Sequence, residues 1–139
     1  LFDCGSLHDA IRASISIPML FRPFRKDGRL LIDGGILNPL PLNQVQRTQG
    51  DLLVAIDVNG PTNGKKKKMN PYKLLTESSR MMMQQITRNQ ININRPDILI
   101  QMPGDAYDMM EFNHASQIVK TGIEVTRKAL QRFDESNER

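Results

Sequence analysis

One carboxylate in this chain, that of Asp33, has sequence neighbours that would suit a catalytic group. Asp33 ends a short apolar run, Arg29–Ile32, and is followed directly by Gly34 and Gly35. A strand would hold the base of the aspartate, while two glycines permit backbone angles that other residues avoid and let a substrate or another backbone come close. A carboxylate placed in this way can act as a general base. The structural alternative is that Asp33 caps a turn through its side chain, and the spacing alone does not separate the two.

The other chemically active side chains are expected to have structural or surface roles. His8 and His114 lie far apart, without metal-ligand spacing and without a cysteine partner, so we assign neither a role and expect no metal or cofactor. Asp57 ends another apolar run, and we expect it to cap the following turn. The single cysteine, Cys4, cannot form an internal disulfide and is compatible with a reducing compartment.

Two sequence patterns are compatible with lipid binding, but each also has a simpler structural explanation. The methionines at 81–83, 109 and 110 suit an adaptable acyl-chain surface, but their amphipathic spacing favours helix packing. A basic run suits transient contact with anionic headgroups, at about 1 kcal/mol per lysine near a charged surface, although a solvated loop is the preferred interpretation. The run consists of Lys65, Lys66, Lys67 and Lys68. Aromatic residues make up only 5% of the chain and are not interleaved with these lysines, which argues against nucleic-acid binding.

The composition is that of a folded globular protein. The chain has 139 residues, 39% of them hydrophobic and 24% charged, with a formal net charge of +4. We therefore assign residues 1–139 to a single domain, since this length allows a core without disulfides or metals. No apolar run approaches the roughly 18 residues needed to cross a bilayer.

Periodicity and turn residues divide the chain into elements. The predicted helices are 6–13, 41–49, 71–90 and 113 onward, and the predicted strands are 29–32, 52–58 and 98–102. Residues 15–25, which hold two prolines, should be irregular and partly extended, and Asp27-Gly28 should form a tight turn. We expect an exposed loop at 60–70 and a frayed tail at 134–139.

The order of these elements favours an α/β fold, because apolar strands alternate with helices longer than about ten residues. Residues 52–58 are apolar almost throughout, which is typical of a strand covered on both faces in a parallel sheet. We therefore expect a few-stranded, mainly parallel sheet with packed helices.

Five blocks of sequence resemble one protein family. Residues 10–21 (AIRASISIPMLF) and 28–41 (GRLLIDGGILNPLP) closely resemble the patatin-like phospholipases. Residues 53–59, 83–88 and 95–100 look like later segments of the bacterial branch related to neuropathy target esterase. The blocks follow the family's order over most of the chain. The resemblance implies a patatin-like three-layer α/β/α domain, of which this chain would be the carboxy-terminal part.

The resemblance also implies an activity. Patatin-like enzymes hydrolyse lipid acyl esters, including phospholipids, with a serine–aspartate dyad, and Asp33 matches their aspartate, with Gly34 and Gly35 as its supporting turn. The Gly-x-Ser-x-Gly elbow and the glycine-rich oxyanion loop do not occur in the 139 residues. We expect both upstream of Leu1, and we expect the fragment alone to be inactive. Asp33 would accept the serine proton as the hydroxyl attacks an ester carbonyl.

Two other interpretations stay open. One is a catalytically silent patatin-like domain that binds lipid or a protein partner, which loss of the elbow and the oxyanion loop would favour. The other is a stand-alone interaction module, against which exposed apolar surface would argue. A cytoplasmic or membrane-peripheral location is favoured, with which the lone cysteine is compatible, but any export signal would lie upstream of Leu1, so the compartment stays open.

Overall fold

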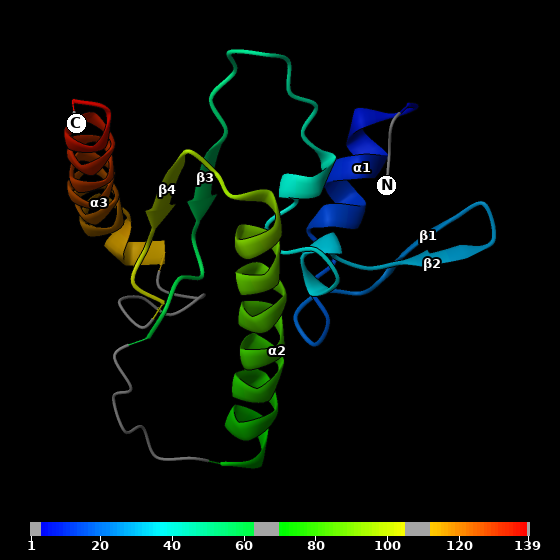
Figure 1. Cartoon of the computed structure of the whole chain (residues 1–139). Helices are drawn as coiled ribbons and strands as arrows, with labels where there is room; N and C mark the ends of the chain where they lie inside the picture. Colours follow the sequence, from blue (N-terminus) through cyan, green and yellow to red (C-terminus); the bar gives the residue numbers. More distant parts are fainter. Residues whose placement is uncertain (1–3, 63–69, 105–111, 139) are drawn as a thin grey trace. The chain divides into compact units, whose positions relative to one another are not determined.

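The structure is a computed structural model that describes residues 4–62, 70–104 and 112–138 (Figure 1). Helices and short strands make up an α/β fold, as the sequence predicts. The chain forms two compact units, Leu1–Pro39 and Leu40–Arg139. The helices and strands are α1 (Leu7–Ser14), β1 (Phe24–Lys26), β2 (Arg29–Leu31), β3 (Val54–Asp57), α2 (Pro71–Asn94), β4 (Ile98–Gln101) and α3 (Ala115–Asn137).

The first unit begins with the helix that the sequence predicts. The Ser6 hydroxyl caps α1 by accepting a hydrogen bond from the Asp9 N–H at 3.4 Å. At the other end, the Ile15 N–H donates to the Ile11 carbonyl at 3.0 Å. The helix therefore lies one residue later than its predicted range of 6–13.

β1 and β2 form an antiparallel hairpin, in which Lys26 lies opposite Arg29. Asp27 and Gly28 join the two strands with φ angles of 49° and 72°, and two successive positive angles match the right-handed twist of a hairpin. The predicted turn is therefore confirmed. Residues 15–25 are expected to be irregular and partly extended, and their extended part is Phe24 and Arg25, which belong to the strand that pairs with β2.

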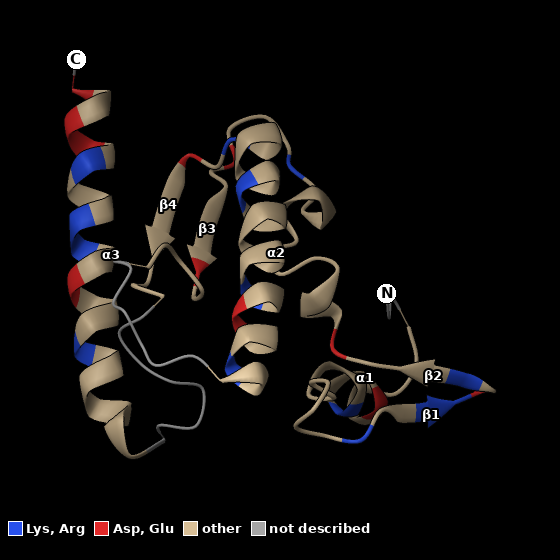
Figure 2. Ribbon diagram, turned by 90° about the horizontal axis from the view of Figure 1, so that it is seen from below, with Lys and Arg blue, Asp and Glu red and all other residues tan. Residues whose placement is uncertain are grey.

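The second unit holds a parallel pair of strands. β3 runs beside β4 with Val54 opposite Ile98 and Asp57 opposite Gln101, which confirms the predicted parallel pairing. α2 is the crossover connection that parallel strands require. Both ribbon views place α3 beside β4 and α2 on the β3 side of the sheet (Figures 1 and 2). Basic and acidic residues lie along much of α3 (Figure 2), as expected of a helix that keeps one side in water.

One face of β3 supplies the core of the second unit. The buried residues are Leu40, Leu42, Leu53 and Ala55, against which Ile91 and Leu99 pack. The opposite face is apolar but open, with exposed fractions between 48% and 67% at Leu52, Val54, Ile56 and Val58. Our expectation of a strand covered on both faces is therefore wrong for the described residues. Side chains alternate between the faces of a strand, and only one set meets α2 and the 3-10 turn η2 (Leu42–Gln44).

The predicted helix over 41–49 is also wrong, because η2 is the only helical turn in this segment. The Asp51 carboxylate accepts hydrogen bonds from the Thr48 N–H at 2.8 Å and from the Thr48 hydroxyl at 2.7 Å. Such local side-chain contacts offer the backbone an alternative to helical hydrogen bonds. Leu42 meanwhile is buried in the core, which holds η2 in place.

The two long helices lie where the sequence predicts them, although α2 continues to Asn94, four residues beyond its predicted range of 71–90. Asn70 caps the start of α2 by accepting from the Lys73 N–H at 2.7 Å, and Arg95, which has a φ of 44° and precedes Pro96, caps its end. α3 continues through Asp134 to Asn137, within the tail for which we expected fraying. Most of the predicted loop at 60–70 lies outside the described residues. Within the described ranges, none of the helices is both long and apolar enough to span a bilayer.

Asp97 ties the start of β4 to the start of β3. Its carboxylate accepts hydrogen bonds from the Leu53 N–H at 2.7 Å and from the Arg47 guanidinium at 2.6 Å. The bond from Leu53 lowers the pKa of Asp97 most, and the Arg47 charge lowers it further. Both contacts favour the ionised form over the protonated form.

This pKa predicts a pH-dependent contribution to stability. A pKa that is lower in the folded state means that the contribution is complete above the unfolded pKa, about 3.9, and is lost as the pH falls through the folded pKa. We expect Asp97→Asn to lower the urea midpoint near neutral pH and to flatten its decline in acid. Midpoints measured between about pH 6 and pH 2 check this. Glu135→Gln, an exposed change of equal charge on α3, should leave the acid decline unchanged.

Candidate functional site

Asp33 lies where β2 passes into the 3-10 turn η1 (Gly34–Ile36). Its side chain is half-buried, and its Oδ1 accepts a hydrogen bond from the Gly35 N–H at 2.9 Å. The carboxylate therefore caps this turn, as the structural alternative requires. A carboxylate has about four lone-pair sites, so one capping bond leaves it able to accept a further proton or hydrogen bond.

Of the two glycines after Asp33, only Gly35 supports the carboxylate, and it does so in a way that the sequence does not reveal. Neither has a positive φ, so our expectation that both supply unusual backbone angles is wrong. A Cβ on Gly35 would lie 3.3 Å from Oδ1 and 3.6 Å from Oδ2 of Asp33, whereas a Cβ on Gly34 would meet nothing within 4 Å. Gly35 therefore leaves room for the carboxylate, and Gly34 has no such role.

Ser16 anchors Asp33 from a distant part of the same unit. The Asp33 N–H donates to the Ser16 carbonyl at 3.0 Å, and Ser16 itself has an exposed fraction of 0%. Sequence reasoning missed this residue. A small polar residue between apolar neighbours, four positions after an arginine, is the signal that could have drawn attention to it.

Asp57 has the structural role that we expected. Its Oδ1 accepts from the Asn59 N–H at 3.0 Å, which caps the turn after β3, and its Oδ2 accepts from the Gln101 side-chain amide at 3.0 Å. With an exposed fraction of 6% and both oxygens engaged, the carboxylate links the carboxyl ends of β3 and β4.

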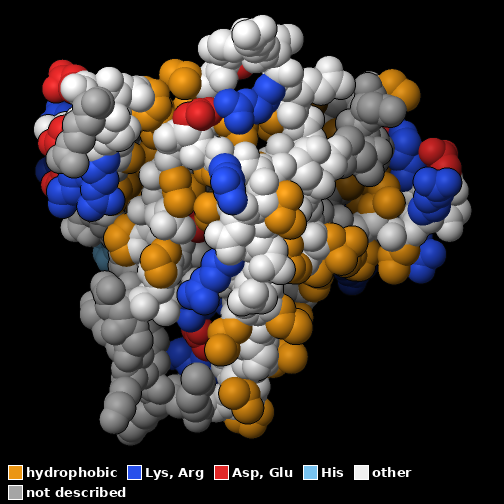
Figure 3. Space-filling view, viewed as in Figure 1, with side chains coloured by type: hydrophobic (Ala, Val, Ile, Leu, Met, Phe, Trp, Pro, Cys, Tyr) orange, Lys and Arg blue, Asp and Glu red, His pale blue; other side chains and the backbone are white. Residues whose placement is uncertain are grey.

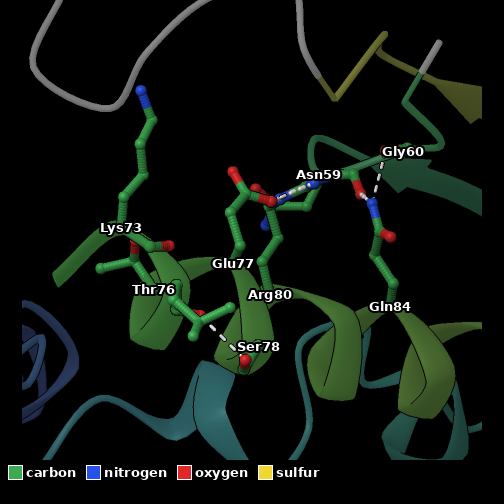
Figure 4. Close-up of polar contacts among 9 residues, drawn as sticks. Asn59, Gly60, Lys73, Thr76, Glu77, Ser78, Arg80 and Gln84 are labelled. Carbon is green, nitrogen blue, oxygen red and sulfur yellow. Dashed lines mark hydrogen bonds and ion pairs between the residues drawn. The ribbon is translucent and has the colours of Figure 1, made fainter. Parts of the chain in front are cut away.

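A cavity of about 310 Å³ lies between this end of the sheet and α2. Its polar lining includes Gln84, whose amide donates to the carbonyls of Asn59 at 3.3 Å and Gly60 at 3.0 Å (Figure 4). One turn earlier on α2, Glu77 and Arg80 form an ion pair. The Gln84 contacts hold the loop after β3 against α2, whereas the ion pair lies within the helix, so both have a structural function.

The other candidate residues lie outside any site. His8 is exposed, with its Nδ1 3.8 Å from Asp9 Oδ1. Met81 and Met82 in α2 have exposed fractions of 65% and 63%. Helix packing is therefore the wrong interpretation for these two. Hydrophobic side chains are visible on the face of the molecule shown in Figure 3. Among residues 4–62, 70–104 and 112–138, no group of three or more His, Cys, Asp or Glu side chains could hold a metal.

Two segments for which a lipid contact was the less favoured alternative lie outside the described residues. They are the lysine run and the second methionine pair, namely Lys65, Lys66, Lys67, Lys68, Met109 and Met110. Membrane contact through the lysines therefore stays a prediction.

The segment that contains Asp33 matches a known protein family. Residues 2–45 match the model of the patatin-like phospholipases. An NTE family protein of Mycobacterium tuberculosis is 46% identical over 70 residues, which cover 50% of this chain and 19% of that protein. A second one from the same organism is 43% identical over 54 residues, covering 39% of this chain and 9% of the relative.

A relative from yeast has a more specific name. The lysophospholipase NTE1 of Meyerozyma guilliermondii is 38% identical over 48 residues, covering 34% of this chain and 3% of the relative. The chain spans about a fifth of the length of the first mycobacterial relative and a smaller share of the others.

Proposed function

We propose that the chain is part of a patatin-like lipid acyl hydrolase of the NTE-related branch, with Asp33 as the general base of the full-length protein. The observation that supports the role of Asp33 most directly is its place. A half-buried carboxylate lies at a strand-to-turn junction, with one capping bond and with Gly35 leaving space beside it. Asp33 also lies inside the segment that matches the family model.

In this proposal, the nucleophile is a serine outside the 139 residues. Its oxygen attacks the ester carbonyl, and its proton passes to the Asp33 carboxylate. The ester bond then breaks, the alcohol leaves with that proton, and the acyl group stays on the serine. Water attacks the acyl-enzyme, gives its proton to Asp33, and releases the fatty acid as the serine recovers a proton. Because a carboxylate is a weak base, oxyanion donors must also lower the barrier, by about 3 kcal/mol each.

We propose lysophospholipids or phospholipids as the substrate class. The name of the yeast relative supports this choice, and the family as a whole supports a lipid ester. The second candidate is a silent member of the family that binds lipid or a protein partner through the same fold.

The test uses the full-length protein with two esters, 1-palmitoyl-lysophosphatidylcholine and p-nitrophenyl butyrate, and a fluorophosphonate probe that labels activated serines. A hydrolase releases fatty acid or nitrophenol and takes the label on one serine, which peptide mapping locates. A folded protein that hydrolyses neither ester and takes no label would instead be the silent binding member.

Gly35 and Gly34 provide a matched pair of variants. In Gly35→Ala the new methyl group presses on the Asp33 carboxylate, so the carboxylate must move by a few tenths of an ångström. Because misplaced catalytic groups cost rate steeply, we expect kcat on p-nitrophenyl butyrate to fall about tenfold. Gly34→Ala places its methyl group in open space and should change kcat less than about twofold. Equal effects of the two changes would remove the steric role of Gly35.

A further inference from the structure

Arg12, in the last turn of α1, joins several parts of the segment that follows the helix. Its guanidinium donates to the Ser16 hydroxyl at 2.7 Å and to the Arg22 carbonyl at 3.2 Å. Its Cζ also lies 5.8 Å from the centroid of the Phe24 ring, within the range of a cation–π contact. Because a guanidinium is planar and its donors have fixed directions, these contacts hold three residues in one arrangement.

Ser16 transmits this constraint to Asp33. Its hydroxyl accepts from the Arg12 guanidinium and donates to the Arg12 carbonyl at 2.8 Å, while its N–H donates to the Ala13 carbonyl at 3.0 Å. Its own carbonyl accepts the Asp33 N–H at 3.0 Å. Every polar group of this fully buried serine therefore has a partner. A shift of Ser16 would break several hydrogen bonds at once, including the one to Asp33.

A second path runs through the hairpin. Arg12 contacts Phe24 in β1, and Phe24 lies opposite Leu31 in β2. Leu31 is only two residues before Asp33, so the position of β1 also determines where the aspartate leaves the hairpin. Arg12 thus contacts both supports of the Asp33 backbone.

We propose that Arg12 is a positioning residue for Asp33, which acts through Ser16 and β1 to hold the carboxylate where it can accept the serine proton. This inference rests on the proposed function. Its consequence is a specific kinetic signature, because a misplaced base slows proton transfer without removing the groups that bind substrate.

The experiment measures kcat and KM on p-nitrophenyl butyrate for variants of the full-length protein. We expect Arg12→Ala to lower kcat about 10- to 100-fold and to leave KM within about twofold. Arg12→Lys should recover at most part of the rate, because one ammonium cannot reproduce the fork that reaches Ser16 and Arg22 together. If Arg12 acts through Ser16, the loss in Arg12→Ala combined with Ser16→Ala should be smaller than the product of the two single losses.

Arg25→Ala is the matched control, since Arg25 is an exposed arginine on β1 of the same unit, and it should keep the wild-type kcat. A folded Arg12→Ala protein with kcat within about twofold of wild type would overturn the proposal. So would a change confined to KM, or full recovery in Arg12→Lys. If Arg12→Ala melts below the assay temperature, Arg12→Lys decides, because it keeps the charge and the long aliphatic stem; wild-type kcat in that variant overturns the proposal.

An Asp33→Asn arm separates this inference from the function on which it rests. Full activity of Asp33→Asn would reject Asp33 as the base, and the proposed function would fail with it. Loss of activity in Asp33→Asn together with full activity in both Arg12 variants would reject only the role of Arg12.

Discussion

Full-length protein carrying Asp33→Asn is expected to lose ester hydrolysis, with kcat reduced about 10²- to 10⁴-fold, while its melting temperature stays close to wild type. The asparagine oxygen can still accept the Gly35 N–H, so the cap of η1 is retained. The amide cannot take the serine proton at neutral pH, so the general base is lost. Release of nitrophenol and a thermal melt, made on the same sample, check both halves of this expectation.

Asp33→Ala removes the general base and the capping group together. It should be as inactive as the asparagine variant and less stable by about 1 kcal/mol, the usual contribution of a capping side chain. If Asp33 were only a cap, the outcome would differ clearly. Asparagine would then retain full turnover, and alanine would reduce stability while leaving most of the activity.

The largest expected effect on stability is at Gly104. The loops that follow β3 and β4 meet closely, with the Gly104 N–H donating to the Pro61 carbonyl at 3.0 Å. A Cβ on Gly104 would lie 2.1 Å from the Gly60 carbonyl oxygen, and a Cβ on Gly60 would lie 2.3 Å from the Met102 carbonyl oxygen. These are backbone atoms, so no change of rotamer can relieve the clash. We expect Gly104→Ala to destabilise the protein by about 3 kcal/mol.

Gly122→Ala is the control for this change, because the same methyl group is added at a permissive place. A Cβ there would lie 3.9 Å from the Met102 sulfur, an ordinary contact, and Gly122 lies inside α3. Glycine in a helix interior costs about 0.5–1 kcal/mol relative to alanine, so this variant should gain stability. Urea unfolding of both variants measures the difference. A loss below about 0.5 kcal/mol in Gly104→Ala would show that the two loops separate easily.

The sequence by itself predicts the features that depend on neighbouring residues. The first helix, the Asp27-Gly28 turn and the start of α2 follow from local hydrogen bonds and from permitted backbone angles, whereas α2 continues four residues beyond its predicted end at residue 90. β3 and β4 follow from short apolar runs, and a helix long enough for a crossover between them makes a parallel pair the expected arrangement. Asp33 was singled out for the same reason, since a carboxylate between an apolar run and two glycines is visible in the sequence.

Only the tertiary structure decided which distant groups meet. Residues 41–49 have the pattern of a helix, yet core burial of Leu42 and the Thr48–Asp51 contacts leave a single turn. The apolar run of β3 does not reveal that one of its faces is open. Likewise, no local pattern shows that the Asp33 backbone is held by a serine 17 positions earlier, 3.0 Å away. Such contacts depend on the packing of segments far apart in the chain, which propensity and periodicity do not encode.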